Sequence, residues 1–334
     1  MKSILFFVLL LCSTLLMSQA NINEVFAAGV DDAERFTNDY MAPVSEGLIY
    51  SISNGWYNSA SSKPLAGFEI SIIANGASFK NNEDKKAFVL NTADYDNLQF
   101  VDGSTSKSVS TGLGDIENVM VYVEDENGLF REEFELPTGL ASENINFVPS
   151  AFVQVSVGLI KGFEVKARFL PKIDTDNASM GFYGVGLQHE FTSLLPLEKV
   201  WPIAISGVIG YTHLDGSYDF TDTGIVSGED QRIETDVNTW VFQAVVSTKM
   251  PIINFYGGIG YLTGKSETDV LGTYEVTSGP FQQTITDPFS LTKEASGVTA
   301  NIGTKLKLGF FRLHADYAIA EFNSLSVGVN FGFR

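Results

Sequence analysis

Cysteine and positive charge are the two things that this sequence has least of. Its 334 residues include one cysteine, and 21 Lys and Arg stand against 40 Asp and Glu, which gives a formal net charge of −19. One cysteine excludes a disulfide within the chain and a zinc site made of several thiolates. So few bases exclude a nucleic-acid binder, which needs cations to neutralise phosphates. Only 18% of the residues are charged and 12% are aromatic, which excludes a disordered acidic tail.

Long apolar runs are also missing beyond residue 20. Before it, Lys2 precedes an apolar stretch over 4–16, and Ser18-Gln19-Ala20 has the small-x-small pattern of a cleavage site. This order is typical of a secretory signal peptide over 1–20, whose removal also removes Cys12. Later in the chain no apolar run approaches the ~18 residues of a spanning helix. A mature chain in a membrane must therefore be a closed β-barrel, because only helices and closed barrels satisfy every backbone group in lipid.

Strand-like alternation fills the second half of the chain. Nine segments after residue 145 place apolar residues at every second position, and most of them have about nine residues or more. Strands of soluble proteins usually end near five or six residues, whereas spanning strands need about nine to eleven. Trp56, Trp201 and Trp240 fit the aromatic belts found at membrane interfaces. The pattern predicts an all-β fold, a transmembrane antiparallel barrel with a short helical N-terminal segment.

The end of the chain carries the most specific motif. Ser326-x-Gly328-x-x-Phe331-x-Phe333 resembles the C-terminal signal of outer-membrane barrels, which the barrel-assembly machinery reads. The resemblance implies the bacterial outer membrane as the location, with outer-membrane lipid and that machinery as partners. It also implies a periplasmic C-terminus. The tight turns at 161–162, 250–251 and 309–310 then face the periplasm, and the long stretches 219–235 and 265–296 face outward, as is usual for such barrels.

The number of strands depends on an acidic region over 80–145. Residues 81–145 hold 14 acids and four bases. One strand at 65–79 precedes this region and nine follow it. If the region adds two strands, the barrel has about twelve, which we expect; if it is one extracellular excursion, the barrel has ten. Extra short strands would give fourteen.

The predicted organisation is a signal peptide over 1–20, a helical segment over 21–63 and the barrel over 64–334. The helix runs from two aspartates near residue 31 toward Tyr40, and Pro43 follows it. The inferred inner wall leans basic, so we predict that the acidic segment plugs the barrel by pairing with that wall. The alternative is a periplasmic tail. The candidates for the lumen lining are Glu164, Lys166, Arg168, Glu190, Lys305, Lys307, Arg312, His314 and Asp316.

Four short elements carry a family resemblance: residues 32–40, Gly55-Trp56-Tyr57, residues 111–115 and the final strand. In these elements and in layout the chain resembles an uncharacterised outer-membrane barrel family, a domain of unknown function, of Bacteroidota-type bacteria. The resemblance covers nearly the whole mature chain and implies placement rather than mechanism. More remotely, the plan is similar to long-chain fatty-acid transporter-like barrels, whose N-terminal hatch carries Asn-Pro-Ala. Here Met41-Ala42-Pro43 lacks the Asn.

Two histidines are candidates for chemistry. His213 and Asp215 resemble the pair at the outer rim of omptin-type proteases, whereas His314 and Asp316 point into the lumen, where a hydrogen-bonding role is expected. One pair two residues apart is a weak signal, and we expect no enzyme, catalytic residue, metal or cofactor. The expected function is passive transport or binding of a small solute through a partly plugged lumen. The alternative is a structural or interaction barrel with acidic surface loops and no transport.

Overall fold

The computed structural model describes residues 22–124, 131–194, 202–220, 226–276 and 284–333. The predicted signal peptide and Trp201 lie outside these residues. Within the described ranges, no helix combines the length and apolar character needed to cross a bilayer.

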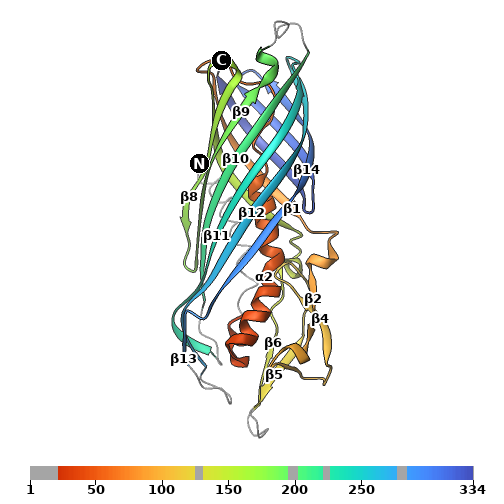
Figure 1. The fold of residues 1–334 in the computed structure, drawn as a ribbon, viewed down its shortest axis with the longest axis vertical. Helices are drawn as coiled ribbons and strands as arrows, with labels where there is room; N and C mark the ends of the chain where they lie inside the picture. Colours follow the sequence, from red (N-terminus) through yellow and green to blue (C-terminus); the bar gives the residue numbers. More distant parts are fainter. Residues whose placement is uncertain (1–21, 125–130, 195–201, 221–225, 277–283, 334) are drawn as a thin grey trace.

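Ten antiparallel strands close into a barrel (Figure 1). The ring is complete because β1 pairs along its whole length with β7 on one side and with the last strand, β16, on the other. A further short strand, β13 (Thr284–Thr286), adds to the end of β12. The ten barrel strands are β1 (Phe68–Ser78), β7 (Phe147–Gly158), β8 (Phe163–Asp174), β9 (Ala178–Glu190), β10 (Ile203–Asp219), β11 (Val226–Thr248), β12 (Ile253–Val276), β14 (Phe289–Leu308), β15 (Phe311–Ile319) and β16 (Asn323–Phe333).

The barrel is smaller than the twelve strands predicted, because the acidic region adds none. Between β1 and β7 the described residues 79–124 and 131–146 lie outside the barrel, and we call this part of the chain the excursion 79–146. Their strands have five residues or fewer and pair with one another in two small sheets, β2–β4 and β3–β5–β6. Five residues are too few to span a bilayer. These strands are β2 (Ala87–Asn91), β3 (Gln99–Phe100), β4 (Ser106–Ser110), β5 (Met120–Glu124) and β6 (Arg131–Glu135).

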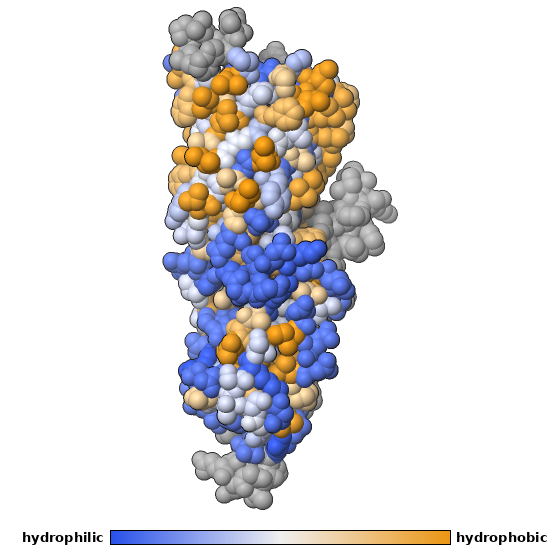
Figure 2. All heavy atoms as spheres, turned by 90° about the vertical axis from the view of Figure 1, so that its right-hand side faces the viewer, coloured by the Kyte–Doolittle hydropathy of each residue, from blue (hydrophilic) through white to orange (hydrophobic). Residues whose placement is uncertain are grey.

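Outward side chains form an apolar belt around one half of the molecule (Figure 2). On β10 the outward positions are apolar over 203–211, nine residues, and turn polar from His213 onward. An aromatic pair marks this edge of the belt, where Trp240 lies opposite Tyr211 with ring centroids 4.9 Å apart. Phe68 and Phe333 stack at 5.0 Å near the other edge. We call the barrel end near Phe333, with the turns at 159–162, 249–252 and 309–310, the short-turn end, and the opposite end the long-loop end.

The strands differ greatly in length, so one side of the barrel projects far beyond the belt. β11 and β12 have 23 and 24 residues, more than twice the ~9–11 that spanning needs. By contrast, β8 and β9 are joined by a tight hairpin near residue 175. The projecting ends of β11, β12 and β14 carry residues 22–45 and the excursion 79–146. We call this assembly the head.

Helix α2 (Val30–Ser53) begins in the head and ends inside the barrel (Figure 1). A short 3-10 helix, η1 (Ile22–Ala28), precedes it. α2 continues past Pro43, although the sequence suggested that the helix ends before it. A proline inside a helix costs about 3 kcal/mol or more. The helix tolerates this cost because side chains of its second half, among them Ile49, Tyr50 and Ile52, are fully buried inside the barrel.

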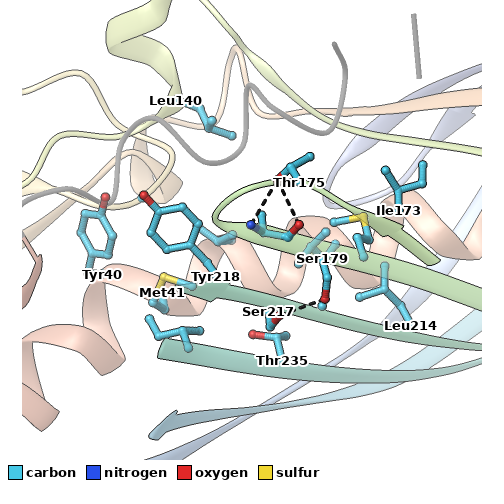
Figure 3. A pocket seen from close by; sticks show the side chains of 17 residues that line it. Tyr40, Met41, Leu140, Ile173, Thr175, Ser179, Leu214, Ser217, Tyr218 and Thr235 are labelled. Atoms are coloured by element: carbon cyan, nitrogen blue, oxygen red, sulfur yellow. Dashed lines mark hydrogen bonds between the residues drawn. The ribbon is translucent and has the colours of Figure 1, made fainter. Parts of the chain in front are cut away.

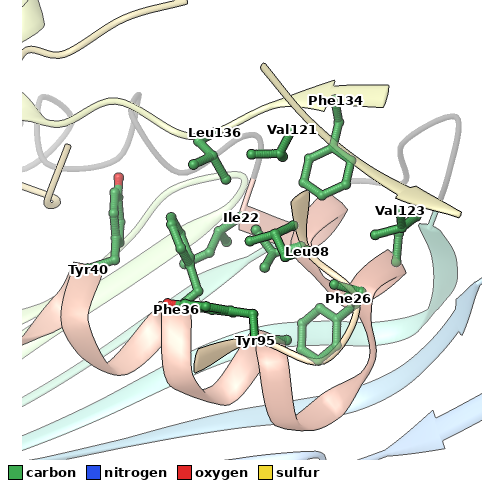
Figure 4. Packing of buried hydrophobic residues seen from close by; sticks show 14 of the residues in the cluster. Ile22, Phe26, Phe36, Tyr40, Tyr95, Leu98, Val121, Val123, Phe134 and Leu136 are labelled. Atoms are coloured by element: carbon green, nitrogen blue, oxygen red, sulfur yellow. The ribbon is translucent and has the colours of Figure 1, made fainter. Parts of the chain in front are cut away.

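Two apolar cores hold the molecule together. The first fills the head, where side chains of η1 and α2 meet those of β3, β5 and β6 (Figure 4). Phe26 extends this core to the projecting strands, stacking on Tyr274 at 4.4 Å and on Phe289 at 5.8 Å. The second core lies in the barrel around the end of α2 and includes Trp56 and Tyr57. The head is thus joined to the barrel by continuous packing along α2.

Candidate functional site

The interior of the barrel is occupied by the chain itself. After α2, residues 54–66 (the lumen segment) continue to the short-turn end, where the Ala66 amide donates to the Gly158 carbonyl at 3.0 Å. The chain from residue 22 to residue 66 therefore runs the full length of the molecule, from the head to the short turns. Residues 22–45 of this stretch lie in the head at the long-loop end, and the residues that follow lie inside the barrel.

A buried ion network fixes the lumen segment to the wall. Glu69 on β1 is 1% exposed. Its carboxylate accepts hydrogen bonds from Lys305 Nζ at 2.9 Å, Arg312 Nη1 at 2.7 Å and Asn58 Nδ2 at 3.0 Å. Lys305 Nζ also donates to Asn58 Oδ1 at 2.7 Å. Asn58 thus joins the lumen segment to this network, and Lys63 of the same segment lies 3.8 Å from Glu69.

Two further carboxylates of the wall hold the end of the lumen segment. Glu164 accepts from Lys63 Nζ at 3.0 Å and from Lys166 Nζ at 2.8 Å. Glu190 accepts from the Ser62 amide at 2.8 Å and pairs with Lys249 Nζ at 2.9 Å. All of these contacts lie near the short-turn end. Buried charges of this kind are tolerated only when they are paired; here each carboxylate pairs with a base of the wall, and the lumen segment adds further bonds.

The predicted plug was expected to pair its acids with the basic residues of the wall, and this pairing was wrong. The basic wall is neutralised by Glu69, Glu164 and Glu190 of the wall itself, and the lumen segment adds a base, Lys63. The acids of the N-terminal stretch face elsewhere. The Asp32 carboxylate, for example, accepts the backbone N–H groups of residues 96–98 in the head, at 2.8–3.2 Å. The net charge of the barrel wall therefore does not predict the charge of the segment inside it, because acids and bases on the same face of the wall pair with each other.

Glu46 of α2 is the acid that does form ion pairs, and it forms them in the head. Its carboxylate lies 2.5 Å from Lys85 Nζ and 2.8 Å from Lys293 Nζ. Burial alone would raise the pKa of Glu46, but the hydrogen bonds from the two lysines outweigh it and lower that pKa below its usual value. This cluster joins α2 to the excursion through Lys85 and to β14 through Lys293.

Trp56 occupies the centre of the barrel against two glycines. A Cβ on Gly210 would lie 2.3 Å from the indole, and one on Gly186 would lie 2.6 Å from it. These glycines are directly paired on β10 and β9. The Arg168 guanidinium lies 3.5 Å from the indole centroid, a cation–π geometry. Trp56 was predicted to lie at a membrane interface, and its place in the lumen corrects that prediction.

The wall glycines are the functional residues that sequence reasoning missed. Gly258 and Gly297 face the hydroxyl groups of Tyr57 and Tyr50 in the same manner as Gly210 faces Trp56. Each stands at an inward position, where a side chain would enter space that α2 or the lumen segment fills. The sequence did contain a signal for them. A glycine that falls on the same side of a strand as the inward charged residues leaves room for a segment inside the barrel.

The other predicted lumen residues lie at three depths. His314 and Asp316 are buried, with His314 Nδ1 2.9 Å from Asn330 Nδ2 and Asp316 accepting from the Tyr256 hydroxyl at 2.9 Å. Lys307 lies at the short-turn rim, where its Nζ donates to the Met250 carbonyl at 3.2 Å. Arg168 is the deepest and donates to the carbonyls of residues 52 and 54.

The outer rim gives no support to a catalytic pair. His213 Nδ1 lies 3.0 Å from Asn238 Oδ1, and His213 Nε2 lies 3.6 Å from Asp236 rather than beside Asp215. Among the described residues no group of His, Cys, Asp and Glu is arranged to hold a metal ion. In the C-terminal motif, Ser326 and Gly328 face inward while Phe331 and Phe333 face outward, the alternation that the motif requires.

An apolar cleft opens where α2 leaves the barrel (Figure 3). It has a volume of about 110 Å³, comparable to the ~150 Å³ of engineered apolar cavities that bind benzene. It lies beside the β8–β9 hairpin, whose residues between 173 and 180 form part of its lining. β10 ends level with this hairpin, whereas β11 continues past it. The lining residues are Tyr40, Met41, Val44, Leu48, Gly112, Leu140, Ile173, Thr175, Ala178, Ser179, Met180, Leu214, Gly216, Ser217, Tyr218, Ile233 and Thr235.

The chemistry of the cleft is that of an uncharged site. None of the residues that line it carries a charge, although the chain as a whole is strongly acidic. Met41 and Leu214 are among its apolar lining residues, and the hydroxyl groups of Ser179 and Ser217 lie on β9 and β10 (Figure 3). Those two hydroxyls are 2.9 Å apart and bond to each other. An apolar lining with a few hydroxyls is typical of small-molecule sites.

Comparison with solved structures finds other barrels at low similarity. Ail, the attachment invasion locus protein of Yersinia pestis, is 9% identical, with a TM-score of 0.28, over 81% of this chain and 100% of that chain. The translocator domain of autotransporter NalP from Neisseria meningitidis is 10% identical, with a TM-score of 0.30, over 94% and 99%. The toluene transporter TbuX from Ralstonia pickettii is 8% identical, with a TM-score of 0.21, over 90% and 99%. These similarities carry no argument about function.

Comparison with curated proteins gives no match. A family model matches residues 1–333, and it is described as a family of unknown function. The match spans the N-terminal stretch, the head and every strand of the barrel. The chain therefore belongs to the family of unknown function DUF6588.

Proposed function

We propose that this protein is a bacterial outer-membrane barrel, closed by its own N-terminal chain, that binds a small uncharged apolar solute in the cleft beside α2. The observation that carries the proposal is the cleft itself. It is an apolar, charge-free space of about 110 Å³ in an acidic head, bordered by α2 and the rim of the barrel. The solute would meet Met41 and Leu214 with its apolar part and the hydroxyl groups of Ser179 and Ser217 with any polar part.

Three features support the outer membrane as the location. The outward belt is nine residues high on β10, the length of a spanning strand. Aromatic side chains mark both of its edges, as in membrane barrels. The barrel leaves no edge strand within the belt, and closure is the condition for strands to lie in lipid. The predicted signal peptide and C-terminal motif agree with this location.

Binding fits the interior better than open passage does. A ten-stranded barrel is little wider than the eight-stranded kind, which side chains alone fill. Here α2 and the lumen segment also lie inside, fixed by the network around Glu69 and Glu164. Passage of a solute beyond the cleft would require the lumen segment to leave its bonds. We therefore expect the intact protein to show no steady current in a planar bilayer, and a steady current would refute the filled lumen.

The binding test uses fluorobenzene as the probe and full-length protein in detergent. Broadening of its fluorine NMR line should be greater with wild type than with Gly216→Leu. Gly216 lines the cleft, and a Cβ there meets no atom closer than 3.6 Å, so we expect a leucine side chain at this position to occupy part of the cleft. Gly207→Leu, which points outward from the same strand, is the matched control and should behave as wild type. 4-Fluorobenzoate, a charged ring of similar size, should show no difference between wild type and Gly216→Leu.

Equal broadening by wild type and Gly216→Leu would mean that the probe sits in the micelle or elsewhere on the protein. That result would overturn the cleft as the site and leave the structural or interaction role, with acidic surface loops and no solute, as the better account.

A further inference from the structure

The head and the short turns lie at opposite ends of one threaded chain. At the long-loop end, Phe26 stacks on Tyr274 and Phe289 of the projecting strands. At the short-turn end, Lys63 pairs with Glu164. Residues 26 and 63 are thus separated by the full height of the apolar belt. Whichever way the barrel points, the chain between them crosses the membrane inside the barrel.

The wall surrounds this crossing. Ser51 Oγ of α2 bonds to Ser150 Oγ of β7 at 3.0 Å. Tyr50 lies against Gly297 of β14, and Ile49 lies against Gly264 of β12. β7 stands far from β12 and β14 in the ring, with at least two strands between them along either arc. The helix is therefore enclosed on several sides and does not lie in a groove open to lipid.

The outward surface of the head is polar, which requires that the head lie in water. On β12 the outward positions beyond Tyr261 are Thr263, Lys265 and Glu267, which are unsuited to lipid. The head must therefore stand in water on the side of the long loops. In outer-membrane barrels long loops face the outside of the cell.

We infer that the barrel displays the head on the cell surface, with residues 46–66 as a tether that reaches it from the periplasmic end through the lumen. This inference rests on the proposed outer-membrane location but not on solute binding. It adds a surface-display function: the head is presented to the medium, and its residues 22–45 are linked to the start of β1 through the inside of the barrel.

Cysteine labelling of the full chain in cells tests the inference, because the sequence contains no cysteine after Cys12. Asn38→Cys places a thiol on the exposed side of α2 in the head, and Ile160→Cys places one on a short turn where the native side chain is 62% exposed. A membrane-impermeant maleimide should label Asn38→Cys in intact cells as fully as in permeabilised cells. It should label Ile160→Cys only after the outer membrane is permeabilised.

A paired variant tests the threading. In Ser51→Cys with Ser150→Cys, mild oxidation should join α2 to β7 in the same protein molecules whose head is on the surface. Ser51→Cys alone is the matched control and should show no shift in mobility. Surface labelling at position 38 without the cross-link would mean that the head reaches the surface outside the barrel, which overturns the inference.

The two proposals fail in different ways. If Asn38→Cys is protected in intact cells while the protein fractionates with the outer membrane, the surface display is wrong and the location stands. If the protein does not fractionate with the outer membrane, the proposed location is wrong and the display falls with it.

Discussion

Alanine at position 210 should displace the central residue of the plug. Gly210 faces Trp56, and a Cβ there would lie 2.3 Å from the indole. Because atoms in protein interiors are close-packed, the ring would have to retreat by about 1 Å to restore an ordinary contact. The retreat is opposed by Arg168, whose guanidinium packs on the ring at 3.5 Å and is itself held by backbone carbonyls at 3.0 and 3.1 Å.

The size of the effect can be bracketed. Overpacking a core by one methyl group costs about 1–3 kcal/mol when neighbours can adjust. Complete loss of the tryptophan from its site would cost about 3–5 kcal/mol, and a desolvated cation–π contact contributes about 2 kcal/mol. We expect Gly210→Ala to lower the free energy of unfolding by about 2–4 kcal/mol, within this bracket. Gly207→Ala, on the same strand but facing outward, should cost about 1 kcal/mol or less.

Urea unfolding of the protein folded in lipid vesicles measures both variants, and a double-mutant cycle isolates the contact. Trp56→Ala removes the ring, so adding Gly210→Ala to it should cost almost nothing more. If Gly210→Ala costs as much in the Trp56→Ala background as in wild type, the glycine serves the strand rather than the plug. The reasoning from close approach would then be refuted.

Two further predictions concern the ends of the tether. Because the lowered pKa of Glu46 stabilises the folded head, that contribution is present above the ordinary glutamate pKa of about 4.3 and is lost as the pH falls through the depressed value. Proteolysis of the excursion should therefore speed up below about pH 4 in wild type. In Glu46→Gln the excursion should be cleaved fast already at pH 7, with little further increase in rate at low pH. If Glu46→Gln keeps the wild-type increase in rate, other carboxylates cause it. Lys305→Glu should expose the lumen segment to protease, because Lys305 Nζ donates a hydrogen bond to Asn58 at 2.7 Å. Lys307→Glu should not, because Lys307 forms its hydrogen bond at the rim. Equal effects of the two charge reversals would show that the net charge of the wall alone retains the segment.

The inward face of the barrel was readable from the sequence because alternation is a local property. Glu164, Lys166 and Arg168 occupy every second position of one strand, and the structure places all three inside. The same local rule failed over 80–145. A five-residue strand alternates in the same way whether it spans a membrane or joins a small sheet, and nothing within it specifies the partner.

The site itself depended on contacts between distant residues. Tryptophan is a residue type common at membrane interfaces, so the sequence alone suggested that place for Trp56. Its contact with the glycines on β9 and β10 shows that the ring lies inside the barrel. Glu69 was visible as a polar residue in a strand, but its partner Lys305 is 236 residues away. The cleft forms where α2, the excursion and the ends of β8 to β11 meet, and the ends of strands are the boundaries that a sequence pattern defines least well.

The seam between β1 and β16 has a consequence for the order of folding. Phe68 pairs with Phe333, so the ring closes through a pairing that joins the two extremes of the barrel sequence, at a loop-closure cost of about 5 kcal/mol. Every other strand pair can form from a hairpin or a shorter loop. The sheet can therefore assemble as an open trough, receive α2 from its unsealed edge, and shut around it last. Formation of the native state should accordingly be slow, and variants that weaken this single seam should accumulate an intermediate with its strands paired and its helix not yet enclosed.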